Sequence, residues 1–338
     1  MDVDGAVGVA EKLLSEIRDP LTIDGHELTV TGSSGIVLGN SEQLRAEDFL
    51  RCADAAMYRS KRGGKNRYEI FDVERDGLSI NRLRLESDLR QAIERKEFRV
   101  HYQPEVLLHS EKIVSFEALV RWEQPGRGLI FPSEFIPLAE ETGLIDRIGY
   151  WVLKESCRRV RDWQDRYPLG TPLTLSVNLS ARQFRYPELV EEVAGVLGET
   201  ALEPSDLTLE VTESAAMSDA PYAMAIFGEL KSLGVKLAID DFGTGYCSLS
   251  SLKRFPVDVL KVDRSLVKGI ERDPANVAIV STIMTLAHGL GLQVVVEGVE
   301  TVGEFAKLRS LGVDLGQGYY WWRARAAEEI PELLASHP

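Results

Sequence analysis

The amino-acid sequence predicts an α/β fold in which a barrel of eight strands follows a smaller N-terminal α/β fragment. Eight β-rich runs alternate with amphipathic helical stretches over about 250 residues, a length typical of eight strand–helix units that close into a barrel. Polar residues stand at the ends of these runs, where burial in a sheet would favour apolar ones. The first 73 residues have a separate pattern, which corresponds to half of an α/β sandwich.

Length and composition limit the class of protein. The 338 residues, 44% hydrophobic and 27% charged, suit one large domain with a smaller one. No apolar run approaches the ~20 residues that cross a bilayer, and the N-terminal MDVDGAVGVAEKLL lacks the apolar core of a secretory signal. We therefore expect a cytoplasmic chain with no membrane segment.

Cysteine usage and net charge indicate the compartment of the protein and limit the class of its partners. Cys52, Cys157 and Cys247 are odd in number and far apart, which fits a reducing compartment, with Cys157 as a small core residue. The formal charge of −14 argues against a duplex nucleic acid as partner. A small anionic ligand remains compatible with this charge if divalent cations are bound beside the acids.

The N-terminal elements follow a simple order. A helical pattern covers residues 6–16, and an Asp24-Gly25 turn lies within the β-rich run LTIDGHELTVTGSSGIVL. The helical pattern AEDFLRCADAAMYRSKR then leads through GGKNR to the strand-like YEIF. We predict a fragment at residues 1–73, a linker at 74–82 and a large domain at 83–330.

The large domain opens with a helix, LRLESDLRQAIERKEF, and continues with eight predicted strands. In chain order these are FRVHYQP, SFEALVRW, TLSVNL, LTLEV, VKLAID, DVLKVD, QVVVE and DLGQGYY. The connection VLLHSEKI between the first two is too short for a crossover helix. The pattern therefore predicts a TIM-type (β/α)8 barrel with one antiparallel strand.

Polar side chains gather at the carboxyl ends of these strands, where parallel barrels carry their chemistry. Two neighbouring carboxylates, Asp240 and Asp241, repel each other unless a proton or a cation lies between them. Taken alone they fit a turn as well as a metal site. The whole set is Glu117, Asn178, Glu210, Asp240, Asp241, Lys261, Glu297 and Gln317. Because all but the lysine are hard oxygen ligands, the set predicts a magnesium or manganese site.

Residues 83–327 resemble the EAL-domain family of cyclic-di-GMP phosphodiesterases. The signature triplet is Glu117-Ala118-Leu119 within FEALVRW. The companion motifs, in the family's order, are YQP, SVNLSARQF, LEVTES, IDDFGTGYCSL, LKVDRSLV, VVVEGVE and QGYY. Eight motifs in one order make a chance match negligible.

The resemblance implies roles for individual residues. Glu117, Asn178, Glu210 and Asp240 would hold one Mg²⁺ or Mn²⁺, and Asp240 and Asp241 would serve a second. Lys261 would position the attacking water, and Glu297 would act as a base or orient it. Ca²⁺ would inhibit, since its larger size and looser geometry would place the water poorly.

Cyclic-di-GMP is the ligand that the resemblance implies, with a homodimer through the EAL domain as a further implied partner. Arg121 would reach a phosphate, Gln103 and Leu119 would help to hold the guanine side, and Gln317 would hold a metal-bound water or the ligand. Glu213 would restrain the DFGTGY loop, its alternative reading being a solvated helix cap.

Two positions depart from the family pattern. Cys247 stands where serine is usual, and Trp321-Trp322 follow QGYY. The tryptophans would either reshape the guanine pocket or cap the core.

Residues 1–73 resemble the C-terminal half of a GGDEF (diguanylate cyclase) domain, through ADAAMYRSKRGGKNRYEIFD and the hairpin before it. The Gly-Gly-Asp/Glu-Glu-Phe motif does not occur in the 338 residues, so we expect no cyclase activity from this chain. Two functions remain for the large domain: hydrolysis of cyclic-di-GMP to linear pGpG, or a catalytically silent cyclic-di-GMP receptor. The full set of expected ligands favours the enzyme. A magnesium-dependent enolisation enzyme on a similar barrel is disfavoured by the eight motifs.

Overall fold

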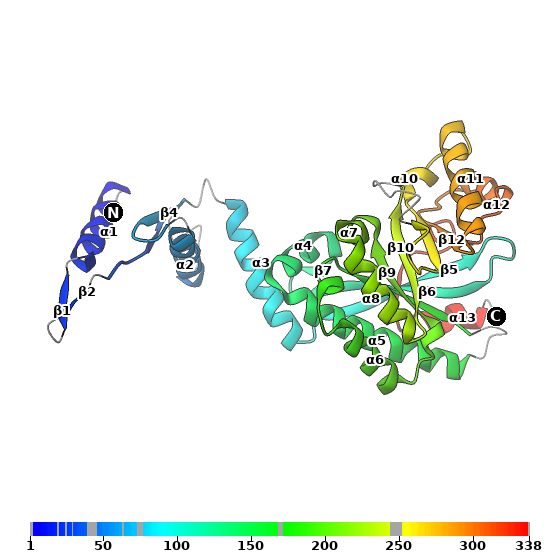
Figure 1. The fold of residues 1–338 in the computed structure, drawn as a ribbon, viewed down its shortest axis with the longest axis horizontal. Helices are drawn as coiled ribbons and strands as arrows, with labels where there is room; N and C mark the ends of the chain where they lie inside the picture. The colour runs from blue at the N-terminus through cyan, green and yellow to red at the C-terminus, as the bar shows by residue number, and fades with distance from the viewer. Residues whose placement is uncertain are drawn as a thin grey trace. The chain divides into compact units, whose positions relative to one another are not determined.

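The chain divides into two compact units, Met1–Gln91 and Ala92–Pro338, in the computed structural model (Figure 1). The structure describes residues 3–18, 20–23, 26–28, 30–38, 46–62, 64–72, 77–167, 172–243 and 252–336. Cys247 and the expected linker residues 74–76 lie outside these ranges.

The first unit is a small α/β assembly. Its elements are α1 (Val3–Arg18), β1 (Leu21–Ile23), β2 (His26–Leu28), β3 (Ser34–Leu38), α2 (Ala46–Arg62) and β4 (Tyr68–Asp72). The pair β1–β2 is antiparallel, and β3 and β4 run parallel, with α2 as their crossover. Cys52, Ala56 and Phe71 form a small core with Val37 and Phe49 packed against it.

Helix α3 (Gly77–Glu94) follows and includes the division between the two units. Residues 77–82, which the sequence analysis placed in a linker, are therefore helical. Leu89 is buried on this helix, and Leu85 is half-buried.

The second unit contains a closed barrel of eight strands, which confirms the predicted fold. The strands are β5 (Phe98–Leu107), β6 (Ile113–Gln124), β8 (Thr174–Leu179), β9 (Leu207–Thr212), β10 (Lys236–Phe242), β11 (Val259–Val262), β12 (Gln293–Val296) and β13 (Leu315–Gly316). Each of the eight predicted runs contributes one of them. Short strands β7 (Gly128–Ile130) and β14 (Arg325–Ala326) extend the sheet beside β6 and β5.

One strand of the barrel is antiparallel to its neighbours, as the short connection predicted. The barrel strands β6 and β8 through β13 run parallel to one another, whereas β5 pairs antiparallel with both β6 and β13. The pairing of β5 with β6 begins at Phe98↔Trp122, and the pairing with β13 joins Leu107 to Leu315. These two pairings close the barrel.

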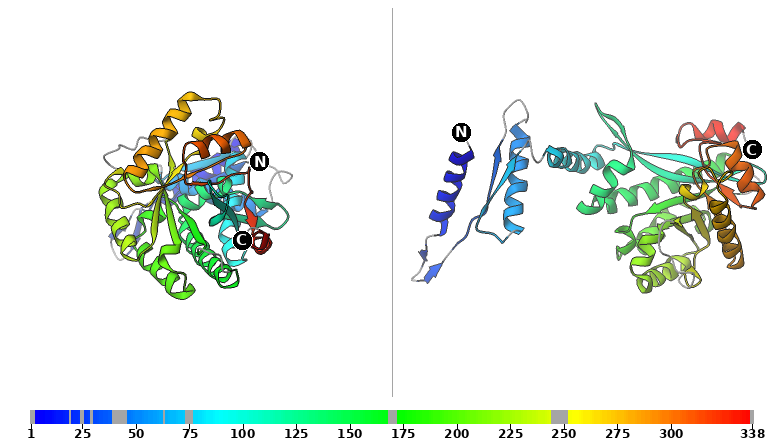
Figure 2. Two further views of the ribbon diagram at one scale, coloured as in Figure 1. Left: turned by 90° about the vertical axis from the view of Figure 1, so that its right-hand side faces the viewer. Right: turned by 90° about the horizontal axis from the view of Figure 1, so that it is seen from above.

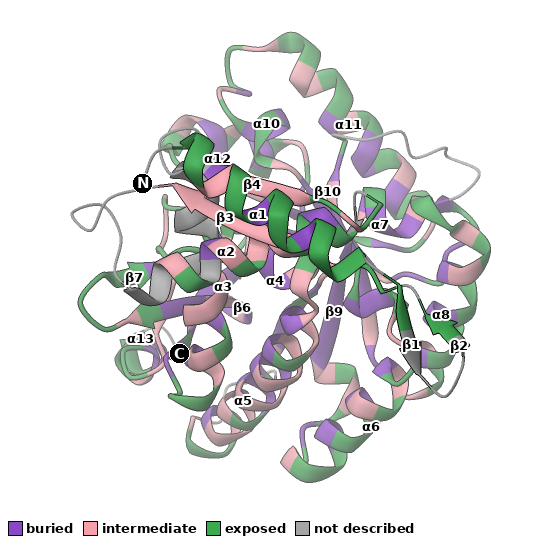
Figure 3. Ribbon diagram, turned by 90° about the vertical axis from the view of Figure 1, so that its left-hand side faces the viewer, coloured by how far each residue is buried: buried purple, intermediate pink, exposed green. Residues whose placement is uncertain are grey.

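Helices surround the strands (Figure 2). They are α4 (Pro132–Thr142), α5 (Leu144–Arg166), α6 (Leu189–Thr200), α7 (Glu213–Ser218), α8 (Ala220–Ser232), α10 (Arg264–Val267), α11 (Pro274–Gly289), α12 (Val302–Ser310) and α13 (Ile330–Ser336), with short 3₁₀ turns at Gln183–Arg185 and Pro204–Asp206. Figure 3 shows β9 buried along its length, while the helices alternate between buried and exposed residues. No helix among the described residues is long and apolar enough to span a bilayer.

The register of the parallel strands decides which side chains share a level inside the barrel. Asn178 on β8 pairs with Glu210 on β9, and Glu210 pairs with Ala238 on β10. Because side chains alternate along a strand, Glu210 and Asp240 face the same side of the sheet. The apolar floor of the barrel consists of Ala238, Val259, Val295 and Leu315, with Leu107 and Val114 packed against it.

Glu304, at the start of α12, connects two loops by hydrogen bonds. Its carboxylate accepts the N–H groups of Gly269 (2.9 Å), Glu300 (2.8 Å) and Thr301 (3.0 Å), the last as part of a capping box. Burial disfavours the charged form, but these N–H donors outweigh it and lower the pKa of Glu304.

We expect Glu304→Ala to lower the free energy of unfolding of the second unit by about 1–3 kcal/mol, because buried N–H donors lose their acceptor. A carboxyl whose folded pKa is lowered stabilises above its unfolded pKa and loses this effect as pH falls. The difference from wild type should therefore be present at pH 7 and shrink below about pH 4.5. Urea unfolding at several pH values measures it. The exposed neighbour substitution Glu300→Ala is the control and should change stability by less than about 0.5 kcal/mol.

Candidate active site

Lys261 lies at the centre of a carboxylate cluster inside the barrel. Its Nζ is 2.6 Å from an oxygen of Glu297, 2.8 Å from Glu210 and 3.6 Å from Glu117. Burial disfavours its charge, but the surrounding Glu117, Glu210, Glu297 and Asp240 carboxylates raise the pKa of Lys261 well above its ordinary value. The lysine is therefore a permanent cation at physiological pH.

Glu117 is held by two amides from opposite sides of the barrel. Asn178 donates its Nδ2 to one carboxylate oxygen and Gln317 donates its Nε2 to the other, each at 2.6 Å. Asn178 lies on β8, Gln317 directly follows β13, and Glu117 itself lies on β6. Side chains from three of the predicted strands therefore meet at one carboxylate. A 180° turn of the Asn178 amide would present its oxygen at the same place.

Asp240 and Asp241 diverge at the end of β10. The backbone of Asp241 is left-handed, with φ of 55°, and its N–H donates to Asp240 Oδ1 at 2.8 Å. Few non-glycine residues adopt this conformation, which costs of the order of 1 kcal/mol. Burial and then the neighbouring Asp240 and Asp263 carboxylates raise the pKa of Asp241. The turn separates the two side chains, and the Lys261 ammonium opposes the rise in the pKa of Asp241.

Glu297 begins the loop after β12, and this loop packs tightly. Burial raises the pKa of Glu297 to about 8, although the Lys261 ammonium opposes the shift. The loop is held by Gly318, because a Cβ at this position would lie 2.0 Å from the carbonyl oxygen of Val299. Val299 N–H in turn donates to the Gln317 carbonyl at 3.1 Å. Only glycine at 318 allows Glu297 and Gln317 to approach the cluster together.

The donor set suits a hard divalent cation. Five carboxylates, those of Glu105, Glu117, Glu210, Asp240 and Glu297, act electrostatically on Lys261, which leaves the cluster strongly negative. Glu210 Oε1 and Gln317 Oε1 are buried without a hydrogen-bond partner, and buried oxygens of this kind call for a donor or a cation. Their chemistry therefore fits Mg²⁺ or Mn²⁺.

The cluster is not a preformed cage. Among the described residues, no three His, Cys, Asp or Glu side chains form a group that could hold a metal ion. The reason lies in the present hydrogen bonds: amides occupy Glu117 and the Lys261 ammonium occupies Glu210. The predicted ligands share one end of the barrel, and their assignment to a metal stays a prediction.

Glu213 contacts the glycine loop that follows β10. Its carboxylate accepts the Gly243 N–H at 3.2 Å, and the side chain is buried. The helix cap at this position is Thr212, whose hydroxyl accepts from Ala215 N–H. A solvated cap is thus the wrong reading for Glu213. Residues 244–251 of the loop lie outside the described part of the chain.

The three residues predicted to bind the ligand lie on two neighbouring strands: Gln103 on β5, and Leu119 and Arg121 on β6. Gln103 is buried, pairs in register with Glu117, and donates its Nε2 to the Trp322 carbonyl at 3.2 Å. Arg121 is buried, and Leu119 is half-buried. All three lie in the same two-stranded pairing as Glu117.

The two tryptophans after QGYY have different environments. Trp321 stacks edge-on against Phe305 of α12, and its indole N–H donates to Glu111 in the β5–β6 hairpin at 3.0 Å. It also lies against Gly316, where a Cβ would be 2.9 Å from its ring. Trp321 therefore caps the core. Trp322 instead contacts a predicted site residue, because its backbone carbonyl accepts the hydrogen bond from Gln103.

Two acids join the site that the sequence analysis did not single out. Glu105, two residues after Gln103 on β5, is buried, has one oxygen without a partner, and has its pKa raised by burial against the effect of Lys261. Asp263 follows Lys261 by two residues, caps α10 through the Ser265 N–H (2.9 Å), and acts on Asp241. The period of two along a strand could have identified both.

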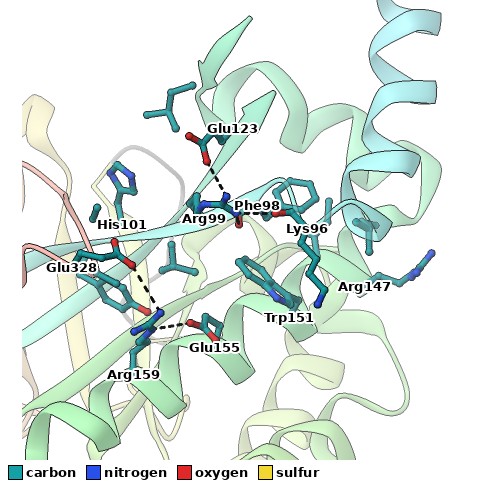
Figure 4. A pocket seen from close by; sticks show the side chains of 17 residues that line it. Lys96, Phe98, Arg99, His101, Glu123, Arg147, Trp151, Glu155, Arg159 and Glu328 are labelled. Carbon is teal, nitrogen blue, oxygen red and sulfur yellow. Dashed lines mark hydrogen bonds and ion pairs between the residues drawn. The ribbon is translucent and has the colours of Figure 1, made fainter. Parts of the chain in front are cut away.

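A separate cavity of about 680 Å³ lies between β5, α5 and residues 326–328 (Figure 4). Arg159 lies between Glu155 and Glu328 in it, and Arg99 pairs with Glu123 at 3.0 Å. None of the predicted site residues lines this cavity, so the carboxylate cluster is the candidate active site.

Comparison with known proteins identifies the family of the chain. The family model of the EAL domain matches residues 86–324, and that of the diguanylate cyclase GGDEF domain matches residues 2–67. The chain belongs to the EAL-domain family.

Individual relatives are consistent with this membership. The bifunctional diguanylate cyclase/cyclic di-GMP phosphodiesterase MucR of Pseudomonas aeruginosa is 44% identical over 98% of this chain and 48% of its own length. The cyclic di-GMP phosphodiesterase PdeR of Escherichia coli is 37% identical over 92% of this chain and 46% of its own. The chain thus spans about half the length of these curated relatives.

A solved structure, the PaMucR phosphodiesterase in complex with c-di-GMP, is similar with a TM-score of 0.70 and 47% identity. The match covers 73% of this chain and 99% of that one.

We expect Lys261→Met to destabilise the second unit by about 3–5 kcal/mol at pH 8 in EDTA, because buried carboxylates lose their cation. Carboxyls whose folded pKa is raised are stabilising when protonated, so the deficit should shrink as pH falls. Denaturant unfolding at pH 8 and pH 5 measures the change. Lys154→Met, which removes a surface ion pair with Glu199, is the control and should change stability far less, because solvent screens exposed ion pairs. Equal losses in the two variants would contradict the central role of Lys261.

Proposed function

We propose that this chain hydrolyses one phosphodiester bond of cyclic-di-GMP to give linear pGpG, with Mg²⁺ or Mn²⁺ as cofactor. The observation that carries the proposal is the gathering of Glu117, Glu210, Asp240 and Glu297 around Lys261 at one end of the barrel. The names of the similar phosphodiesterases and the c-di-GMP complex of PaMucR support the choice of substrate.

The proposed metal ligands are Glu117, Asn178, Glu210 and Asp240, with Asp241 contributing beside Asp240. Bound divalent cations would neutralise phosphate charge and lower the pKa of the attacking water. The buried oxygens without hydrogen-bond partners on Glu210 and Gln317 support this assignment.

The remaining roles belong to side chains of the chain itself. Glu297 would accept a proton from the attacking water or orient that water, and Lys261 holds its carboxyl group in place at 2.6 Å. Water adds to phosphorus as the bond to the leaving sugar oxygen breaks, and that oxygen receives the proton. Arg121 would bind a phosphate oxygen, while Gln103 and Leu119 would hold the guanine side. Glu213 would position the loop through Gly243.

We propose that the chain consists of two parts, which correspond to the two family matches. Residues 1–73 would be a GGDEF-like fragment without the cyclase motif, and residues 83–330 the phosphodiesterase domain, joined through 74–82. The first unit, with its two-stranded parallel β3–β4 sheet crossed by α2, supports this assignment.

A catalytically silent receptor is the second candidate, since the same site could bind cyclic-di-GMP without turnover. The presence of every proposed ligand and of the buried Lys261–Glu297 pair favours the enzyme. A binding measurement paired with a product assay separates the two.

Glu297→Gln should lower turnover by about 10²–10⁴-fold, the effect typical of losing a positioned acid–base group, while most of the cyclic-di-GMP affinity remains. Glu117→Ala should weaken both, because its loss removes a proposed metal ligand. Calorimetric titration and pGpG yield by chromatography provide the two measurements. The exposed acids Glu300 and Glu123, changed to Gln, are the matched controls for Glu297 and Glu117. Tight binding by wild type with Mg²⁺ or Mn²⁺ but no pGpG would establish the receptor instead.

We expect Ca²⁺ to inhibit. A site of hard oxygens does not exclude Ca²⁺, but its larger radius and looser geometry would misplace the water. Rates should fall as Ca²⁺ is added at fixed Mg²⁺ and recover with excess Mg²⁺. Strong activity with Ca²⁺ as the sole divalent ion would count against the proposed site.

A further inference from the structure

Arg121 is held by an aromatic ring outside the motifs of the site. Its guanidinium carbon lies 5.2 Å from the centre of the Phe131 ring, within the range of a cation–π contact. Its Nη1 donates to the carbonyl of Val120 at 2.9 Å. Within the described residues, no carboxylate forms an ion pair with Arg121, although the side chain is only 9% exposed. Its remaining N–H donors are therefore available.

The position of Arg121 directs those donors toward the site. It lies four residues beyond Glu117 on β6, and even spacing places both side chains on one face of the strand. The carboxyl end of β6 is the end at which the cluster lies. Glu117 acts electrostatically on Arg121, so the two belong to one electrostatic environment.

Phe131 occupies a position where its side chain does not cap the helix that follows and is largely exposed. It is the N-cap of α4, makes no side-chain capping bond, and is 52% exposed. Serine, threonine, aspartate or asparagine would stabilise this helix end better. The following Pro132 has a fixed φ, which restricts the backbone that carries the ring.

We propose that Phe131 is a positioning residue, whose ring holds the Arg121 guanidinium at the mouth of the barrel for a phosphate of the ligand. The inference rests on the proposed function, because the phosphate is that of cyclic-di-GMP. Phe131 acts through Arg121 and touches no reacting atom.

The test compares Phe131→Leu, Phe131→Tyr, Arg121→Ala and the double variant Phe131→Leu/Arg121→Ala. Phe131→Leu keeps an apolar side chain but removes the ring, so we expect cyclic-di-GMP affinity to fall about two- to fivefold. The KM should rise by a similar factor with kcat changed less than about twofold. Phe131→Tyr should behave as wild type. In the Arg121→Ala background, Phe131→Leu should have no further effect, since the contact is already lost.

Leu129→Ala is the matched control, because Leu129 is an exposed apolar residue two positions earlier, on β7. It should leave affinity and KM unchanged. Calorimetry measures affinity, initial rates measure KM and kcat, and thermal unfolding shows that each variant is folded.

The outcomes separate this inference from the proposed function. Wild-type affinity in Phe131→Leu, or an equal loss with and without Arg121, overturns the role of Phe131 while hydrolysis stands. Binding without turnover by wild type overturns the proposed function, and the affinities still decide the role of Phe131. No binding of cyclic-di-GMP by wild type overturns both.

Discussion

The ion-pair cluster around Lys261 is the interaction on which the barrel interior depends. A single ammonium lies within 3.6 Å of three carboxylates and is fully enclosed by protein. Such an arrangement is unfavourable on its own, because desolvation of several charges exceeds what one cation returns. The two oxygens left without partners, on Glu210 and Gln317, are part of the same imbalance. This imbalance supports the proposed divalent cation, and under that proposal the stability of the interior would depend on whether the cation is bound.

The barrel makes this cluster possible by placing polar groups above an apolar floor. Ala238, Val259, Val295 and Leu315 fill the lower level, so the strands remain joined by burial of apolar surface. The upper level then carries the charged residues. The loops after β12 and β13 contribute through close packing, since Gly318 lies against Val299 and Thr301–Glu304 fixes the start of α12. The proposed catalytic side chains thus rest on rigid neighbours.

Contacts outside the cluster orient the groups that would meet a ligand. The Trp322 carbonyl accepts a hydrogen bond from Gln103, and the Phe131 ring makes a cation–π contact with Arg121. Glu213 links β9 to the loop after β10 by accepting the Gly243 N–H. In the first two cases a residue with no proposed chemistry limits the positions of one that has a proposed role. Such support matters because small displacements of positioning groups reduce rates strongly.

The sequence by itself determined the order of eight strands, the antiparallel first strand, and the strand ends at which Glu117, Glu210, Asp240 and Lys261 would meet. Period-two alternation and the short VLLHSEKI connection sufficed for this, because both act locally along the chain. Tertiary structure alone decided that Asn178 and Gln317 both bind Glu117, that Glu105 and Asp263 join the site, and that Trp321 packs on Phe305. These contacts join residues up to 200 positions apart, so only the closure of the barrel brings them within bonding distance.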